Sequence, residues 1–469
     1  MSEQRRERDS MGEVEIPRSA YWGAHTQRAI ENFPVSGLVF PPVFLQALAL
    51  VKQACAIVNR DDAALDPSYA EAIIQACREA AEGAFASQFP IDIFQTGSGT
   101  STNMNMNEVI ATRSNEILTG ARRTTQPVHP NDHVNMGQSS NDVIPTAIHC
   151  AVCLQTEQEL FPELDAMAEA IRSQEERFAD VVKTGRTHLM DAMPVTFGQE
   201  LSGWRSHIVH AKDEIAYALR RIRQLAIGGT AVGTGVNTRA GFGTRVARRL
   251  SELTAIEFSE TPNHFEAQSI MNAICAFSSS LRTYAMGLVK IANDLRLMNS
   301  GPFSGLGEIR LASLQPGSSI MPGKVNPVIP EAARMACMQV MGNDAVVALS
   351  CAMGEFELNV MLPVIAHNVL ESITLLSGVS RLMAEKAVRT FEIDRERIAL
   401  ALEKNPIVAT VLNPVVGYDT ASAVVKKSMH EKITVRQAAL ALGVITEEQA
   451  ARLFDIAQMT QPGFSAAGD

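Results

Sequence analysis

The chain has 469 residues, of which 46% are hydrophobic but only 5% aromatic, and its net charge is -10. This length allows a large buried core, and the scarcity of aromatic residues argues against an all-β fold and favours helices. The acidic balance, without any block of Lys and Arg, argues against nucleic acid as the main partner.

The cysteines and the start of the chain indicate the compartment. Seven cysteines are scattered along the sequence, and an odd count in a long chain indicates reduced thiols, so we expect a cytoplasmic protein. Cys150 and Cys153 have the C-x-x-C spacing, but they lie in an apolar helical run and are interpreted as a packed pair one turn apart. Residues 1–17 are charged and lack the apolar region of a signal peptide. The sequence contains no uninterrupted run of about 18 apolar residues, so we expect no membrane span.

The first third of the chain mixes short helices with polar loops. Apolar periodicity predicts helices over residues 44–59 and 69–85, and polar composition predicts loops over residues 95–107 and 129–141. We therefore treat residues 1–140 as an N-terminal lobe that carries binding loops.

Long amphipathic helices follow. Residues 199–226 carry one apolar stripe with steps of three or four residues, formed by Leu201, Trp204, Ile208, Ala211, Ile215, Leu219 and Ile222. Similar runs occupy residues 265–298, 330–347 and 362–390.

These runs predict a mainly α fold with a long central helical bundle over residues 141–395. Shorter helices and turns return over residues 396–469, which we expect to form a small C-terminal lobe. The apolar stripes are too extensive for one chain to cover, which predicts association of several copies rather than a large helical monomer.

Two polar loops in the first third have the composition of anion sites. Residues 96–103 combine hydroxyls, glycines and an amide, which suit an anion held by backbone N–H groups, although an ordinary helix cap has the same composition. Residues 129–142 place Ser139, Ser140 and Asn141 at a predicted helix start, where the helix dipole favours a carboxylate. The two histidines and a carboxylate of this loop also suit a metal, but the excess of amides and hydroxyls favours an organic acid.

Two further loops carry groups for acid–base chemistry. Residues 185–192 place His188 between Thr187 and Asp191, which favours a polar site over a histidine packed in the core. Residues 317–327 read Gly-Ser-Ser-Ile-Met-Pro-Gly-Lys-Val-Asn-Pro, and their glycines and prolines predict a shaped loop. A surface linker is the alternative, but serine, lysine and amide groups are those that an elimination from an acid requires.

The pattern Gly-Ser-Ser-x-Met-Pro-x-Lys-x-Asn resembles the signature of the fumarase/aspartase superfamily. The resemblance runs from about residue 9 to residue 449 and includes segments 94–100, 185–189, 228–235, 356–360 and 412–418. The first three of these segments resemble class II fumarases more than aspartases. The resemblance implies the corresponding helical fold and the reversible anti addition of water to fumarate, which gives L-malate.

The resemblance also implies residue roles. Ser318 is the expected base, His188 exchanges a proton with the water or hydroxyl, and Glu331 orients His188. Lys324 and Asn326 hold the carboxylate that takes up charge. The other expected substrate-binding residues are Ser98, Gly99, Thr100, Ser139, Ser140, Asn141, Thr187, Ser319 and Val325.

No metal or organic cofactor is implied, because the reaction moves no electrons between redox partners. In the superfamily the loops of each site come from different subunits, so the resemblance implies a homotetramer. The expected partners are a small dicarboxylate and further copies of the chain, with no nucleic acid and no membrane.

Several positions depart from the family pattern. Gln126 replaces an arginine of a secondary anion site, and this puts in doubt the site that the resemblance implies at His129, Pro130, Asn131 and Asp132. Phe303 and Met190 replace an arginine and a glutamine. The departures keep open an aspartase-type ammonia-lyase, or a relative that acts on a substituted succinate. Lens crystallins also belong to the superfamily, but retention of the expected catalytic residues argues against a purely structural protein.

Overall fold

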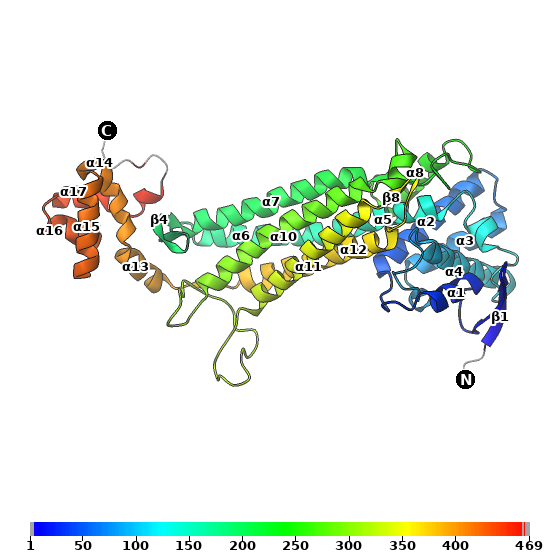
Figure 1. Ribbon diagram of the computed structural model, residues 1–469, viewed down its shortest axis with the longest axis horizontal. Coiled ribbons are helices and arrows are strands. Elements are labelled where there is room, and N and C mark those ends of the chain that lie inside the picture. The colour runs from blue at the N-terminus through cyan, green and yellow to red at the C-terminus, as the bar shows by residue number, and fades with distance from the viewer. Residues whose placement is uncertain (1–3, 462–463, 465–469) are drawn as a thin grey trace. The chain divides into compact units, whose positions relative to one another are not determined.

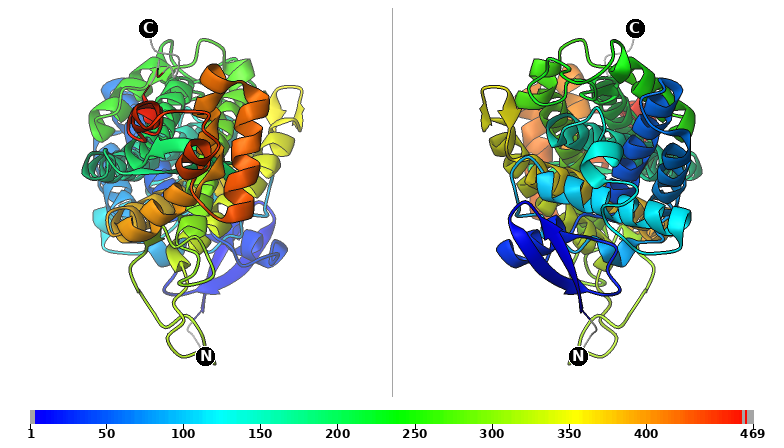
Figure 2. Two further views of the ribbon diagram at one scale, coloured as in Figure 1. Left: turned by 90° about the vertical axis from the view of Figure 1, so that its left-hand side faces the viewer. Right: turned by 90° about the vertical axis from the view of Figure 1, so that its right-hand side faces the viewer.

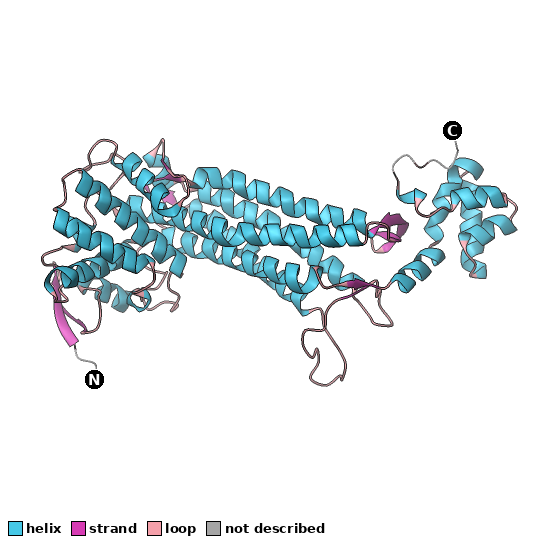
Figure 3. Cartoon of the chain, turned by 180° about the vertical axis from the view of Figure 1, so that it is seen from behind, coloured by secondary structure: helices cyan, strands magenta, loops and turns pink. Residues whose placement is uncertain are grey.

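The computed structural model describes residues 4–461 and residue 464, and most of them lie in helices (Figure 3). The helices are α1 (Ala24–Asn32), α2 (Pro42–Asp61), α3 (Pro67–Ala81), α4 (Thr100–Thr119), α5 (Ser140–Gln155), α6 (Phe161–Arg177), α7 (Phe197–Ile222), α8 (Phe242–Thr254), α9 (His264–Ser269), α10 (Asn272–Met298), α11 (Val328–Cys351), α12 (Leu362–Met383), α13 (Arg395–Lys404), α14 (Asn413–Val416), α15 (Tyr418–Glu431), α16 (Val435–Ala441) and α17 (Glu447–Leu453). The mainly α prediction is confirmed.

The strands are short and pair only two by two among the described residues. They are β1 (Gln4–Asp9), β2 (Gly12–Pro17), β3 (Val182–Thr187), β4 (Met190–Thr196), β5 (Gln224–Leu225), β6 (Ser259–Glu260), β7 (Ile309–Arg310), β8 (Gly354–Glu355), β9 (Leu358–Asn359) and β10 (Glu392–Ile393). The pairs β1–β2, β3–β4, β8–β9 and β7–β10 are antiparallel, and β5–β6 is parallel.

Two compact units divide the chain, and each draws on separate parts of the sequence. Unit 1 is built from the chain up to Pro162 and from segments Ala211–Ala285 and Ala336–Ser377. Unit 2 is built from segments Glu163–His210 and Met286–Met335 and from the chain after Gly378. The boundaries expected at residues 140 and 395 stay predictions.

In unit 1, α2 packs against α3 and α5, and α3 packs against α4 (Figure 1). The interior of α2 is almost entirely buried, with Phe44, Leu48, Val51 and Cys55 all without solvent exposure, so the helix expected over residues 44–59 is confirmed. The hairpin of β1 and β2, blue in Figure 2, packs against α1.

The loop expected over residues 95–107 is only partly correct, because α4 already begins at Thr100. Asn103 and Asn107 are buried in this helix, and each donates a side-chain hydrogen bond to Asn135 Oδ1, at 3.3 and 3.2 Å. Asparagine favours turns when its side chain bonds to the local backbone. Tertiary partners for these amides therefore override a weak local preference.

The long helices follow the predicted apolar periods with two interruptions. The seven residues of the stripe on α7 are each at most 2% exposed, which confirms the pattern read from the sequence. The run expected over residues 265–298 is split into α9 and α10 at Ile270 and Met271, where Met271 has φ 56°. The run after Leu362 ends as a wider turn over Ala384–Val388.

The C-terminal part of unit 2 has a small core of its own. Val408, Leu412, Val424, Ala438 and Leu453 are buried together there. These residues come from α15 to α17 and from the short helix Pro406–Leu412.

Two helical segments, Pro42–Asp61 and Leu362–Val388, are long and apolar enough to cross a membrane by length and composition. In each of them, 67% of the apolar window is buried inside the structure. That degree of burial is typical of core helices in a globular protein.

The two leucines of α8 offer a direct test of the core. Leu250 is fully buried and Leu253 is 37% exposed on the same helix. Replacing Leu250 by Ala should lower the free energy of unfolding by about 3 kcal/mol, since it removes buried methyl groups and leaves a cavity. The Leu253→Ala control should cost less than about 1 kcal/mol. Denaturant unfolding measures both, and equal losses would contradict this packing.

Candidate active site

The first candidate loop is fixed by close backbone approach. Leu362 N donates to Gly97 O at 3.0 Å, and a Cβ atom at Gly97 would lie 1.8 Å from Val360 O, so only glycine fits. Gly99, with φ 72°, caps the start of α4. Ser98 Oγ and Thr100 Oγ1 lie 2.9 Å apart, so the loop presents paired hydroxyls beside the first turn of a helix.

The second candidate loop ends in a helix cap. Ser139 caps α5, its hydroxyl accepts from Asn141 N at 3.2 Å, and Asp142 accepts from Ser139 N at 2.9 Å in a capping box. Asn141 Nδ2 donates to Ala231 O at 2.7 Å, which ties this turn to the glycine-rich segment 228–235. The turn is therefore held from both sides.

The structure brings these two loops of unit 1 together. Asn103 of α4 donates from Nδ2 to Ser140 Oγ at 3.0 Å. A Cβ atom at Gly99 would lie 3.0 Å from the side chain of Ile144 of α5. The first turns of α4 and α5 are thus adjacent, and the positive ends of the two helix dipoles favour an anion there.

The predicted His188 lies at the tip of a strained hairpin in unit 2. Thr187 of β3 pairs with Met190 of β4, which leaves His188 and Leu189 as a two-residue turn with φ values of 56° and 60°. Positive φ at both positions is the geometry of a type I′ turn, which glycine and asparagine prefer. Such strain at a non-glycine pair often marks a functional position, and both side chains are exposed.

Below this hairpin lies a buried group of charges. The Lys183 ammonium, whose side chain is 2% exposed, lies 2.9 Å from both Glu200 Oε2 and Glu308 Oε2. Arg186 Nη1 lies 2.7 Å from Glu308 Oε1. Thr187 lies on β3 with Lys183 and Arg186, and Glu308 immediately precedes β7. The ion pairs therefore link β3 to the chain segment just before residues 311–327.

The fourth candidate loop closes on itself. Gly317 N donates to Lys324 O at 2.8 Å, and Asn326 Nδ2 donates to Gly317 O at 2.6 Å. Ser318 Oγ accepts from the backbone N–H groups of Ile320 and Met321, at 3.2 and 2.9 Å. The loop therefore aims two donors at the hydroxyl of the predicted base, while Lys324 remains exposed.

Glu331 lies in the first turn of α11, directly after this loop. Within the part of the chain that the structure describes, neither Glu331 nor His188 makes a side-chain hydrogen bond or ion pair. Both residues belong to unit 2. The expected pairing of Glu331 with His188 therefore stays a prediction.

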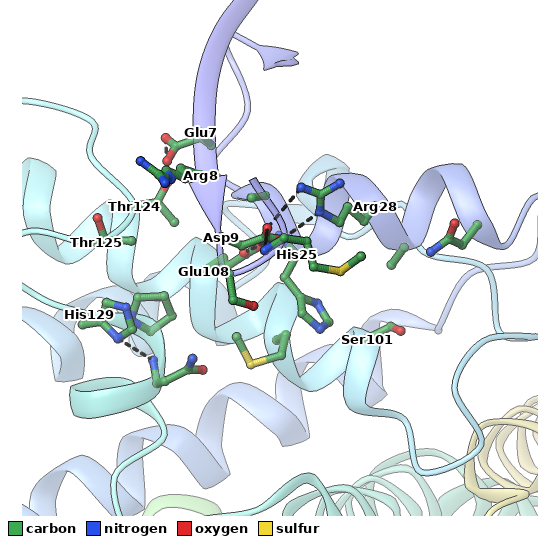
Figure 4. Close-up of a pocket in the computed structure, with 18 of the residues that line it drawn as sticks. Glu7, Arg8, Asp9, His25, Arg28, Ser101, Glu108, Thr124, Thr125 and His129 are labelled. Atoms are coloured by element: carbon green, nitrogen blue, oxygen red, sulfur yellow. Dashed lines mark hydrogen bonds and ion pairs between the residues drawn. The ribbon is translucent and has the colours of Figure 1, made fainter. Parts of the chain in front are cut away.

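Three residues of the expected secondary anion site, His129, Pro130 and Asn131, border a cavity of about 440 Å³ in unit 1 (Figure 4). His129 Nδ1 accepts from Asn131 N and Asp132 N, at 3.2 and 3.3 Å, and so caps the turn Pro130–Val134. Arg28 lies across the cavity, but Asp9 pairs with its guanidinium at 2.8 and 3.1 Å. Anion binding at this site stays a prediction.

Comparison with known proteins identifies the family to which the chain is related. The model of a family described as "Lyase" matches residues 12–342, and that of "Fumarase C C-terminus" matches residues 408–461. A class II fumarate hydratase from Xylella fastidiosa is 47% identical over 98% of this chain and 96% of its own length. One from Corynebacterium glutamicum is 49% identical over 98% and 97%.

The chain belongs to the class II fumarate hydratase family. A crystal structure of class II fumarase from Schistosoma mansoni matches with a TM-score of 0.96 at 37% identity and covers 98% of this chain and 100% of that one. A fumarate lyase:delta crystallin from Brucella melitensis matches with a TM-score of 0.94 at 41% identity, covering 98% and 100%. The resemblance read from the sequence is therefore confirmed.

The departures from the class II fumarate hydratase pattern lie at the surface. Gln126 is exposed, Met190 is 70% exposed and Phe303 is 90% exposed. The Phe303 turn still contacts a cation, because the Arg397 guanidinium donates to the carbonyl oxygens of Pro302, Phe303 and Gly305. That guanidinium is therefore occupied by the backbone of the turn.

In this class II fumarate hydratase family member, the sequence did not reveal the residues that hold the candidate loops in place. Asp142 accepts from Ser139, Gly228 and Thr230 N–H groups, yet it had no expected role. The Ser-x-x-Asp spacing of a capping box was the available signal. Lys183 and Glu308 are 125 residues apart in the sequence, so no local sequence pattern predicts their contact.

Glu308 offers a test of how the hairpin is supported. Glu308→Gln should lower the free energy of unfolding by about 3 kcal/mol, because Lys183 and Arg186 lose a buried carboxylate partner. Glu308→Gln should also reduce the rate of the enzymatic reaction, because β3 carries Thr187 and would be held less firmly. Glu200→Gln is the matched control: it removes the more exposed partner of Lys183 and leaves Glu308 in place. Equal effects of the two variants in unfolding and rate measurements would contradict a special role for Glu308.

Proposed function

We propose that this chain catalyses the reversible hydration of fumarate to L-malate in the cytoplasm, as a hydro-lyase. One observation carries the proposal: the N–H groups of Ile320 and Met321 donate to Ser318 Oγ. Donors aimed at a hydroxyl stabilise the negative oxygen that remains when its proton is lost. A serine so supported can act as a base toward a weakly acidic C–H group.

The reaction of malate then follows in two steps. Ser318 takes the proton from the carbon beside a carboxylate, and the electron pair moves into that carboxylate to give an aci-carboxylate dianion. Lys324 is exposed and supplies a positive charge for this dianion. The C–O bond on the neighbouring carbon then breaks, His188 in its protonated form donates its proton to the departing hydroxyl, and water and fumarate leave. Hydration is the reverse sequence.

The dicarboxylate is held by donors at helix starts. Thr100 opens α4, with Ser98 two residues before it. Ser139 caps α5, whose first residues are Ser140 and Asn141. Hydroxyl and amide donors at the positive end of a helix dipole suit a carboxylate. Thr187, Ser319, Val325 and Asn326 complete the proposed substrate set, with Glu331 orienting His188 from the start of α11.

The same proposal includes a homotetramer with sites shared between subunits. On α11, Met335, Met338, Val346 and Leu349 are 69%, 52%, 38% and 67% exposed. Their spacings of 3, 8 and 3 residues form a single stripe on the helix. An apolar stripe of this extent on an isolated chain is typical of a surface that another copy covers.

Turnover of two substrates tests the proposed reaction. The wild-type protein should convert L-malate to fumarate, followed by the ultraviolet absorbance of fumarate, and should release no ammonia from L-aspartate. Ser318→Ala should lower the malate rate by at least about 100-fold, because the base is lost. Ser313→Ala, an exposed serine earlier in the same segment, is the matched control and should leave the rate unchanged.

Two outcomes would contradict the proposal. Deamination of L-aspartate without dehydration of L-malate would assign the chain to the ammonia-lyases instead. If Ser318→Ala converts malate at the full wild-type rate, the proposed reaction still holds but Ser318 is not its base.

A further inference from the structure

Lys52 of α2 is a charged side chain placed inside the core. It has no solvent exposure, and burial lowers the pKa of its ammonium to about 8. A buried ammonium is costly unless hydrogen-bonded partners offset the loss of water. Core packing alone does not account for a lysine at this position, because an apolar residue of the same length would fill the space without that cost.

The partners of Lys52 all belong to the segment that leads to α5. Its Nζ donates to Asn135 Oδ1 at 2.8 Å and to Gln138 Oε1 at 2.9 Å. Asn135 Nδ2 donates to Gln138 O at 3.2 Å, and Gln138 Nε2 donates to Val134 O at 3.0 Å. The ammonium thus fixes the two amides that shape the turn just before Ser139.

A second route runs from Lys52 to Ser140. Asn135 Oδ1, which accepts from the ammonium, also accepts from Asn103 Nδ2 at 3.3 Å. Asn103 Nδ2 in turn donates to Ser140 Oγ at 3.0 Å. This network joins α2, α4 and the first residue of α5 through side chains that are buried or half-buried.

Lys52 also acts on Asp142 through charge. The Asp142 carboxyl is buried, and burial raises its pKa, while N–H donors from Ser139, Thr230 and Gly228 and the charge of Lys52 oppose that rise. Asp142 must stay ionised to accept all three N–H groups well. A positive charge nearby therefore supports the cap that holds Ser139.

We propose that Lys52 is a positioning residue that keeps the turn Ser139–Ser140–Asn141 in its carboxylate-binding arrangement, through Asn135 and Gln138 and by balancing the charge of Asp142. Lys52 does not touch the substrate. This inference rests on the proposed function, because it assigns carboxylate binding to that turn. It goes further by predicting that a buried cation on another helix sets the affinity of the turn.

The test compares binding with turnover in Lys52→Met, which keeps the length of the side chain and removes the ammonium. Calorimetry with succinate, a dicarboxylate without a leaving group, should give a dissociation constant raised about tenfold, or about 1.4 kcal/mol of binding free energy. KM for L-malate should rise by a similar factor, while kcat should change by less than about threefold, because the reacting groups of unit 2 are untouched.

Cys55→Ala is the matched control. Cys55 is fully buried on α2 one turn after Lys52 and lies outside the proposed site. It should lower the melting temperature and leave succinate affinity and KM unchanged. If Lys52→Met lowers the melting temperature but leaves both constants within about twofold of the control, Lys52 serves stability alone and the inference is overturned.

A second variant keeps the test decisive where Lys52→Met does not fold. Asn135→Asp still offers the ammonium an oxygen, but its other carboxylate oxygen faces Gln138 O, where Nδ2 donated in the wild type. Succinate affinity should fall here too, and wild-type affinity would overturn the inference. Wild-type protein that binds succinate without turning over malate overturns only the proposed function, whereas wild-type protein that does not bind succinate overturns the role of Lys52.

Discussion

A protein built from helices has few places where backbone N–H groups remain free to meet an anion. Inside a helix each N–H is bonded to a carbonyl, and only the first turn leaves donors unpaired. Three of the four candidate loops end at the start of a helix, whereas His188 lies at the tip of the β3–β4 hairpin. Thr100 opens α4, Ser140 opens α5, and the loop with Ser318 ends at the start of α11. Most of the proposed carboxylate-binding residues therefore lie at the ends of long helices.

Such ends work as sites only when their shape is fixed before the substrate arrives, because ordering a loop on binding costs affinity. In unit 1, Asp142 completes the capping box of α5, and Asn103 joins the starts of α4 and α5. In unit 2, Glu308 and Lys183 support the hairpin that exposes His188. The polar interior of each unit thus holds loops in place, while the apolar stripes supply the framework.

The sequence predicted the helical framework, because apolar periods are local signals. Loop composition also indicated four candidate loops, whose chemical roles stay predictions. Sequence reasoning misjudged the stretch after Thr100, where Asn103 was taken for loop but is helical through contacts with distant residues. It also assigned no role to Lys52 or Glu308, whose partners lie far along the chain. What escaped prediction is the set of buried polar contacts that only tertiary structure brings together.

We propose that loops of different subunits combine into one site, and mixed assemblies test this arrangement directly. Ser318→Ala and Asn141→Ala proteins should each lack malate turnover when assembled alone. Unfolding them together in equal amounts and refolding should restore about a quarter of the wild-type rate, since random assembly gives that share of sites two intact contributions from different chains. A mixture as inactive as its parents would contradict the account, because both residues would then belong to one subunit's own site.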